Sequence, residues 1–150
     1  MTWFANVHGG FEGPEGWDEL PAIGLVEELG DPTADPAPFR RSMVLSGDAM
    51  PEGKTPTDYL ALQKILLVGT LPGFALVAEQ VPATVGRVGT LCYRVQPPSG
   101  PALVQRQAYF FQGERVVVLT FTMQENIHGT ARGDVDGLMA EAMESFVAAG

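Results

Sequence analysis

The chain has very few cysteines and histidines, and their scarcity excludes several kinds of site. Its 150 residues include a single cysteine, Cys92, so no internal disulfide can form, which suits a reducing compartment. Cys92 lies within an apolar strand pattern, where a small buried hydrophobe is the expected role. The two histidines, His8 and His128, are far apart and have no acidic or cysteine partner at metal-binding spacing. We therefore expect no metal site.

Motifs for catalysis and cofactor binding are also missing. Ser46-Gly47-Asp48 is ordinary turn chemistry and not a nucleophile elbow. The glycines between Gly9 and Gly13 do not match a dinucleotide fingerprint, because no helix follows directly and no phosphate-binding lysine is placed there. We expect no cofactor and no enzymatic activity. A hydrolase that uses His8 or His128 is the enzymatic alternative.

Positive charge and long apolar runs are scarce as well. Nine basic residues face 18 acidic ones, for a formal net charge of -9. An acidic protein repels phosphate backbones, which argues against nucleic acid and anionic membranes as partners. The start, Met1–Asn6, lacks the basic and apolar regions of a secretory signal, and no apolar run is long enough to span a bilayer. We expect a cytoplasmic protein without direct membrane insertion.

What the chain does contain is the composition of one globular domain, residues 1–150, with 45% hydrophobic residues. Thr55 as a cap, Pro56 and Asp58 predict a helix start. Strands are predicted within 9–17 and at 21–29, 39–47, 74–81, 88–96, 102–112 and 115–123, and helices at 55–68 and 134–147. This order, β-β-β-α-β-β-β-β-α, has no βαβαβ alternation. It therefore predicts an α+β fold, an antiparallel sheet with two helices packed on one face.

One predicted strand carries an unusual pattern of side chains. In residues 103–110, Gln105, Gln107 and Tyr109 fall on one face, and Val104, Arg106, Ala108 and Phe110 fall on the other. With helices on one face only, the other face would be open to solvent. Apolar surface rimmed by hydrogen-bonding side chains is typical of a partner site. The alternative is that loops or a second subunit cover both faces.

Several segments together resemble a known family. They are Phe11-Glu12-Gly13-Pro14-Glu15-Gly16-Trp17, Leu71-Pro72-Gly73-Phe74, Gln105-Arg106-Gln107-Ala108, residues 113–120 and a C-terminal helix that ends in Glu144-Ser145-Phe146. The chain is similar to the DUF1795 (DcrB-like) family within the Mog1/PsbP-like fold, over nearly its whole length. This resemblance implies a curved sheet of six to seven strands.

Family members without a signal peptide are similar to the Eag chaperones of type VI secretion. The resemblance implies a cytosolic homodimer that shields the hydrophobic N-terminal transmembrane segments of a secreted effector, of the PAAR or Rhs type, before export. Carried over by position, the residues that line its groove are Ile23, Leu25, Gln63, Gln105 and Gln107, and the strand pattern adds Tyr109. The alternative is a Mog1-like adaptor that acts on a folded partner.

Overall fold

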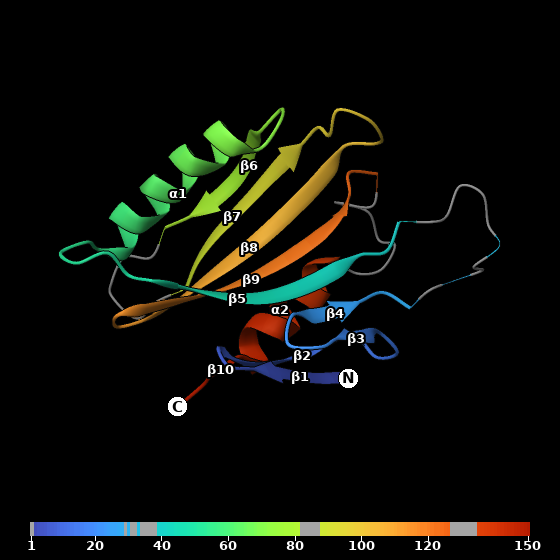
Figure 1. The fold of residues 1–150 in the computed structure, drawn as a ribbon, viewed down its shortest axis with the longest axis horizontal. Helices are drawn as coiled ribbons and strands as arrows, with labels where there is room; N and C mark the ends of the chain where they lie inside the picture. Colours follow the sequence, from blue (N-terminus) through green and yellow to red (C-terminus); the bar gives the residue numbers. More distant parts are fainter. Residues whose placement is uncertain (1, 29, 31–32, 34–38, 82–87, 127–134) are drawn as a thin grey trace.

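The computed structural model describes residues 2–28, 30, 33, 39–81, 88–126 and 135–150. It confirms the α+β class and has two helices (Figure 1). The elements in chain order are β1 (Thr2–Asn6), β2 (Gly9–Gly13), β3 (Asp18–Leu20), β4 (Gly24–Val26), β5 (Ser42–Ala49), α1 (Pro56–Thr70), β6 (Ala75–Gln80), β7 (Val88–Val95), β8 (Leu103–Gln112), β9 (Arg115–Gln124), α2 (Val135–Ser145) and β10 (Val147–Ala148).

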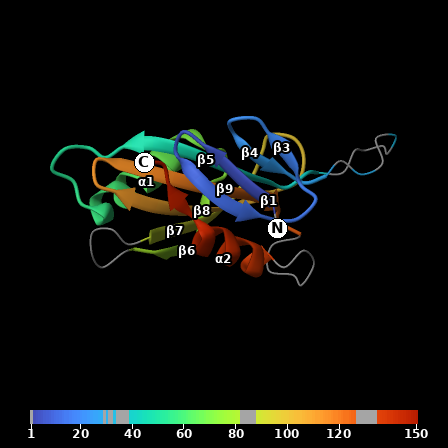
Figure 2. The ribbon, with the colours of Figure 1, turned by 90° about the horizontal axis from the view of Figure 1, so that it is seen from below.

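The main feature is a curved antiparallel sheet of seven strands in the order β3-β4-β5-β9-β8-β7-β6 (Figure 1). The sequence Gln112-Gly113-Glu114 predicts a hairpin turn, and the long central strands β8 and β9 form a hairpin in which Gln112 pairs with Arg115. A second sheet has three strands in the order β1-β2-β10. Figure 2 shows β1 and α2 on the same side of the large sheet.

The helices do not share a face of the large sheet, and this part of the sequence prediction is wrong. Met139 and Ala142 of α2 pack with Ala108 and Phe110 of β8, whereas Tyr59 of α1 packs with the opposite face. Figure 1 shows α1 and α2 on opposite sides of the sheet. Both faces of the central strands are therefore covered in part, each by one helix.

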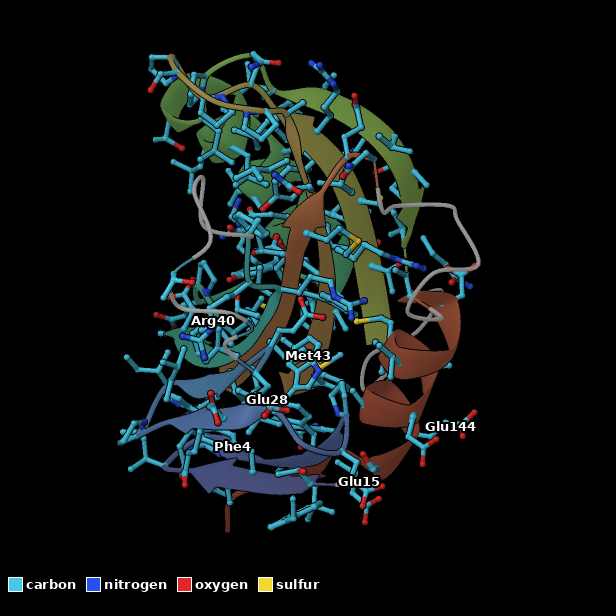
Figure 3. All side chains as sticks on the ribbon, turned by 90° about the vertical axis from the view of Figure 1, so that its right-hand side faces the viewer. Phe4, Glu15, Glu28, Arg40, Met43 and Glu144 are labelled. Carbon is cyan, nitrogen blue, oxygen red and sulfur yellow. The ribbon has the colours of Figure 1, made fainter. Side chains whose placement is uncertain are left out.

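Two separate clusters of buried residues result. We call the cluster under α2 the apolar core; it also takes in β1 and β2, and Figure 3 shows Phe4 and Met43 on this side of the molecule. Its members are Phe4, Phe11, Leu25, Met43, Leu45, Cys92, Val104, Ala108, Phe110, Val117, Leu119, Phe121, Met123, Val135, Met139 and Ala142. We call the cluster under α1 the tyrosine core. Its members are Tyr59, Leu60, Leu91, Tyr93, Val95, Tyr109, Phe111, Val116 and Val118.

Helix α1 begins as the sequence predicts. The Thr55 hydroxyl accepts a hydrogen bond from the Asp58 N–H at 3.2 Å, and the Asp58 carboxylate accepts one from the Thr55 N–H at 3.0 Å. Pro56 occupies the first turn, where its missing N–H costs nothing. The backbone and hydroxyl of Thr55 lower the pKa of Asp58. This cap fixes where the apolar helix sits over the tyrosine core.

The N-terminal region departs most from the prediction. The strand predicted at 21–29 is only β4, and β3 precedes it across a turn in which Ala22 has φ 65°. The predicted final helix ends at Ser145, because residues 147–148 form β10 and pair with β2. Strand β1 was not predicted. Asp134, which the sequence predicts as the cap at the start of this helix, lies outside the described residues.

A candidate partner-binding face beside helix α1

Six uncharged, half-buried side chains form a continuous area on the α1 side of the large sheet. Cross-strand pairing aligns Gln105 with Thr122 and Thr122 with Ser42, and in the next row it aligns Gln107, Thr120 and Val44. Directly paired residues point to the same side of a sheet. We call this area the amide face: Ser42, Val44, Gln105, Gln107, Thr120 and Thr122.

Hydrogen bonds hold both glutamine amides in place. The Gln105 amide donates to the Thr122 hydroxyl and the Gln107 amide donates to the Thr120 hydroxyl, each at 3.1 Å. The amide oxygens accept from tyrosine: Tyr93 donates to Gln105, and Tyr109 donates to Gln107. A primary amide has two donor hydrogens and two acceptor lone pairs. Each fixed amide therefore keeps one donor and one acceptor for another molecule.

The tyrosines that orient these amides are themselves buried and neutral. Tyr93 and Tyr109 are each 1% exposed. Burial raises the pKa of both hydroxyls above the ordinary value, because the phenolate would lose its hydration. They consequently stay protonated as donors at neutral pH. Tyr109 was predicted as a contact residue, and the structure gives it this positioning role beneath the surface.

Helix α1 lies along one border of the amide face. The Tyr59 ring contacts Tyr109 with ring centroids 6.0 Å apart, while Lys64 forms a salt bridge of 2.7 Å with Glu79 of β6. Tyr59 and Lys64 thus mark the two flanks of the helix, and helical spacing places Gln63 on the flank of Tyr59, toward the amide face. Gln63 is half-buried, and its amide has no hydrogen-bond partner among the described residues.

The outward side of α1 is apolar instead of charged. Leu62, Ile65, Leu66 and Val68 are exposed, with Ile65 at 68% and Leu66 at 57%. Helices on a protein surface normally place polar residues there, and a helix that is apolar all round is usually buried. Large exposed apolar areas of this kind mark surfaces that contact another molecule.

The structure separates the other two predicted groove residues from this area. Leu25 is 1% exposed in the apolar core and pairs with Met43, which also faces α2. Assigning it to a binding groove is therefore wrong, because no partner can reach it. Ile23 is 51% exposed at the start of β4, but Gly24, not Ile23, aligns with Val44 of the amide face.

Sequence reasoning missed the hydroxyl half of the amide face. Thr120 and Thr122 alternate with Phe121 and Met123 along β9, and this period of two was the available signal. The β-branched and apolar run from Val116 to Phe121 instead favoured only a central strand of the sheet. On β4, the positions that align with the amide face are Gly24, which pairs with Val44, and Val26, which pairs with Ser42.

The remaining sequence-based candidates lie away from this face. Cys92 belongs to the apolar core, and burial raises the pKa of its thiol. His8 contacts Gly47 of β5, while His128 lies outside the described residues. Within the described part of the chain, no group of three or more metal-ligating side chains comes together, and neither helix is long and apolar enough to cross a bilayer.

The arrangement of the elements is that of the PsbP-like fold. PA94 of Pseudomonas aeruginosa, a protein of unknown function, is 22% identical with a TM-score of 0.66, covering 98% of this chain and 96% of that one. The cyanobacterial PsbP protein CyanoP of Synechocystis sp. PCC 6803 is 16% identical with a TM-score of 0.60, covering 98% and 91%. LpqN of Mycobacterium tuberculosis, which is involved in cell envelope biogenesis, is 18% identical with a TM-score of 0.53, covering 93% and 82%.

These similarities establish the fold and agree with the Mog1/PsbP-like resemblance of the sequence. No family model and no curated protein sequence matches the chain.

Proposed function

We propose that the chain is a non-catalytic binding protein whose amide face and the adjoining flank of α1 shield hydrophobic helices of a client protein. The observation that carries this proposal is that the amide face lies next to the exposed aliphatic side chains of α1. Fixed, uncharged amides lie on the sheet, and exposed aliphatic side chains such as Leu62 and Leu66 lie on the helix beside them.

This chemistry suits an apolar helix that must be kept from aggregating. Burying apolar surface against α1 contributes about 25 cal/mol per Å² removed from water. Small polar groups on the client can pair with the free donor and acceptor of Gln105 and Gln107. Removing an amide from water costs far less than removing a charged side chain. A lysine or glutamate in the same place would oppose binding.

We further propose that the clients are N-terminal transmembrane segments of a type VI secretion effector of the PAAR or Rhs type, held before export. In this proposal the chain is a cytoplasmic, homodimeric member of the DUF1795 (DcrB-like) family, related to the Eag chaperones. The support is the sequence resemblance described above together with an amide face that contains Gln105 and Gln107 and is bordered by Gln63.

A charge placed on the amide face tests the proposal. In Gln105→Glu, the hydroxyls of Tyr93 and Thr122 can both donate to the new carboxylate, so the fold is expected to persist. Gln112→Glu is the matched control, because Gln112 is an exposed glutamine at the end of the same strand. Each variant is co-expressed with the hydrophobic N-terminal region of the effector encoded next to this gene, and the amount of co-purified effector is measured.

We expect Gln105→Glu to reduce co-purification at least about tenfold, because a bound apolar helix would remove the half-buried carboxylate from water without supplying a positive charge. Gln112→Glu should behave as the wild type. Equal recovery with both variants would remove the amide face from the interface. Recovery of a folded partner without hydrophobic helices, through a surface elsewhere, would instead favour the Mog1-like adaptor.

A further inference from the structure

The last strand of the large sheet, β6, leaves one edge open among the described residues. Strand β6 is the final member of the sheet order, and all six of its residues are exposed. Edge strands are usually protected by lysine or proline, or by a covering element. Strand β6 contains neither residue type, and Glu79, its one charged residue, is held by Lys64.

A bulge limits which part of this edge can accept another strand. The pairing with β7 shifts register between Leu76 and Ala78, and regular pairing then continues through Gln80. A bulge twists and interrupts an edge, which protects that end from pairing. The regular stretch that remains, Ala78–Gln80, is about long enough for a short extended peptide.

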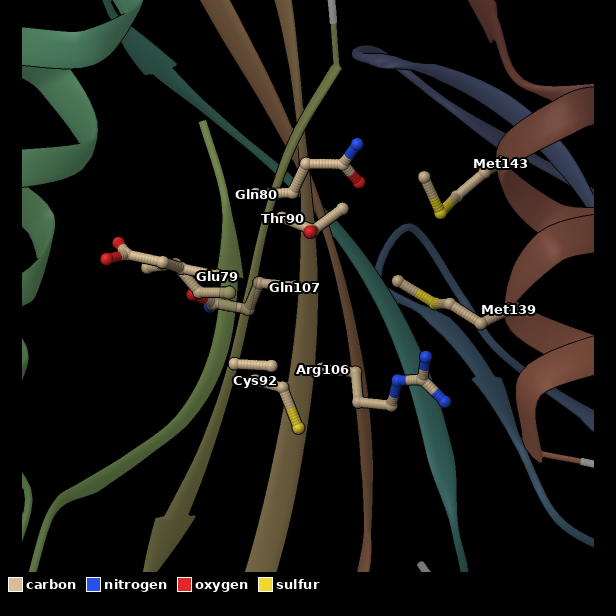
Figure 4. Close-up of a pocket in the computed structure, with 10 residues that line it drawn as sticks. Glu79, Gln80, Thr90, Cys92, Arg106, Gln107, Met139 and Met143 are labelled. Carbon is tan, nitrogen blue, oxygen red and sulfur yellow. The ribbon is translucent and has the colours of Figure 1, made fainter. Parts of the chain in front are cut away.

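A cleft opens beside this same stretch, on the α2 side of the sheet. Its volume is about 340 Å³, and Ala78, Thr90, Cys92, Met139 and Met143 contribute to its lining. Figure 4 shows Met139 and Met143 projecting from α2 toward the strands, with Gln80, Thr90 and Cys92 across the gap. Methionine side chains adapt to apolar groups of different shape. The cleft can therefore receive a side chain from a strand added at β6.

The charges near the cleft indicate which peptide would fit. Arg106 pairs with Asp136, so the basic residue in the cleft wall is neutralised. Besides Asp136, helix α2 contains Glu141 and Glu144 but no lysine or arginine. The acidic residues of α2 would repel the same residues of a second copy placed at this edge, and they would attract a basic segment.

We propose that β6 binds an extended, apolar peptide segment with basic flanks, which adds as a further strand and places one side chain in the cleft. Main-chain hydrogen bonds supply affinity in this mode of recognition, and the cleft supplies selectivity. The surface lies on the α2 side of the sheet, because Ala78 aligns with Cys92 of the apolar core, and of the amide-face residues only Gln107 is also among those that line the cleft. The proposal does not depend on the shielding of helices.

The test uses a fluorescein-labelled peptide, acetyl-Lys-Thr-Val-Met-Val-Thr-Lys-amide, titrated with the full chain by fluorescence polarisation. We expect saturable binding in the micromolar range for the wild type. Ala78→Arg should weaken it at least tenfold, because the side chain enters the cleft and repels the basic flanks. Ala5→Arg, at an exposed alanine on the edge strand β1, makes the same change in net charge and should leave binding unchanged.

A second probe isolates the main-chain contribution. The same peptide with N-methyl groups on both valines keeps its charge and side chains but loses two donors, and its affinity should fall at least tenfold. The proposal fails if the wild type shows no binding up to about 1 mM peptide, or if Ala78→Arg and N-methylation both leave the affinity unchanged. Peptide-free dimerisation that Ala78→Arg abolishes would also overturn it, since a second copy would then occupy the edge.

Discussion

The two faces of the seven-stranded sheet are built from the same strands but are filled by different side chains. Under α2, the apolar core consists of aliphatic, phenylalanine, methionine and cysteine side chains. Under α1, the core contains all three tyrosines of the chain, and the half-buried amide face continues it across β8, β9 and β5. Residues that alternate along one strand therefore serve different purposes.

The difference indicates how stability and binding are divided within the molecule. Alternate residues of β9 show this division. Phe121 is fully buried in the apolar core, whereas Thr120 and Thr122 are half-buried and accept hydrogen bonds from the amides of Gln107 and Gln105. Close packing makes the first kind of residue costly to change. Hydrogen-bonded surface groups contribute less to stability but define what the surface can recognise.

The largest expected effect comes from neighbouring residues of β9. Phe121→Ala should lower the free energy of unfolding by about 3–5 kcal/mol, because it removes a buried ring and leaves a cavity. Thr122→Val removes only the hydroxyl that accepts from Gln105 and should cost about 0.5–1.5 kcal/mol. Chemical denaturation of both variants measures the difference. Equal losses would show that the two faces contribute equally to stability.

Alkaline pH should act mainly through the α1 side, which contains three buried tyrosines, whereas the apolar core contains one buried thiol, Cys92. Burial raises the pKa of Tyr59, Tyr93 and Tyr109 above the ordinary value of 10.0. The unfolded chain then loses these protons first, so stability is fully present below about pH 10 and is lost as the pH rises toward the folded-state values, by up to about 1.4 kcal/mol per pH unit for each tyrosine.

Denaturation curves between pH 8 and 11, read together with tyrosinate absorbance, measure this loss (the pH range brackets the unperturbed tyrosine pKa of about 10). Because the chain has only these three tyrosines, the absorbance reports on the tyrosine core alone. In Tyr59→Phe, the free energy of unfolding should fall less steeply with pH above about pH 10 than in the wild type. Tyrosinate that forms near pH 10 without any loss of stability would mean that the hydroxyls are accessible in the folded protein.

The fold class followed from the sequence because local signals agreed with the final structure. The Thr55 cap, the Gln112-Gly113-Glu114 turn and the period-two strands all reappear, with boundaries shifted by a few residues. The side of the sheet on which each helix packs was not predictable in the same way. Both helices are apolar enough for either face, so the choice depends on long-range packing with β1 and β2.

The candidate site was predictable in part for the same reason. Gln105 and Gln107 stood out because two amides alternate within one strand, and the structure places them together. Leu25 was assigned to a binding groove wrongly because a period-two pattern shows which residues share a face, but not which face the core covers.

The smallest expected effect on stability is on the outer side of α1, where an exposed apolar residue can be compared with a buried one on the same helix. Ile65→Gln should change the free energy of unfolding by less than about 0.5 kcal/mol, because the side chain is already exposed and glutamine is a good helix former. Leu60→Gln, in the same helix but fully buried, should cost more than about 2 kcal/mol.

Chemical denaturation at two protein concentrations measures both variants. A loss above about 1.5 kcal/mol for Ile65→Gln that grows with protein concentration would mean that an assembly buries this side of α1. If the free energy of unfolding of Ile65→Gln equals that of the wild type at both concentrations, the exposed aliphatic side of α1 does not stabilise the fold. That result would agree with a role in contacting a partner.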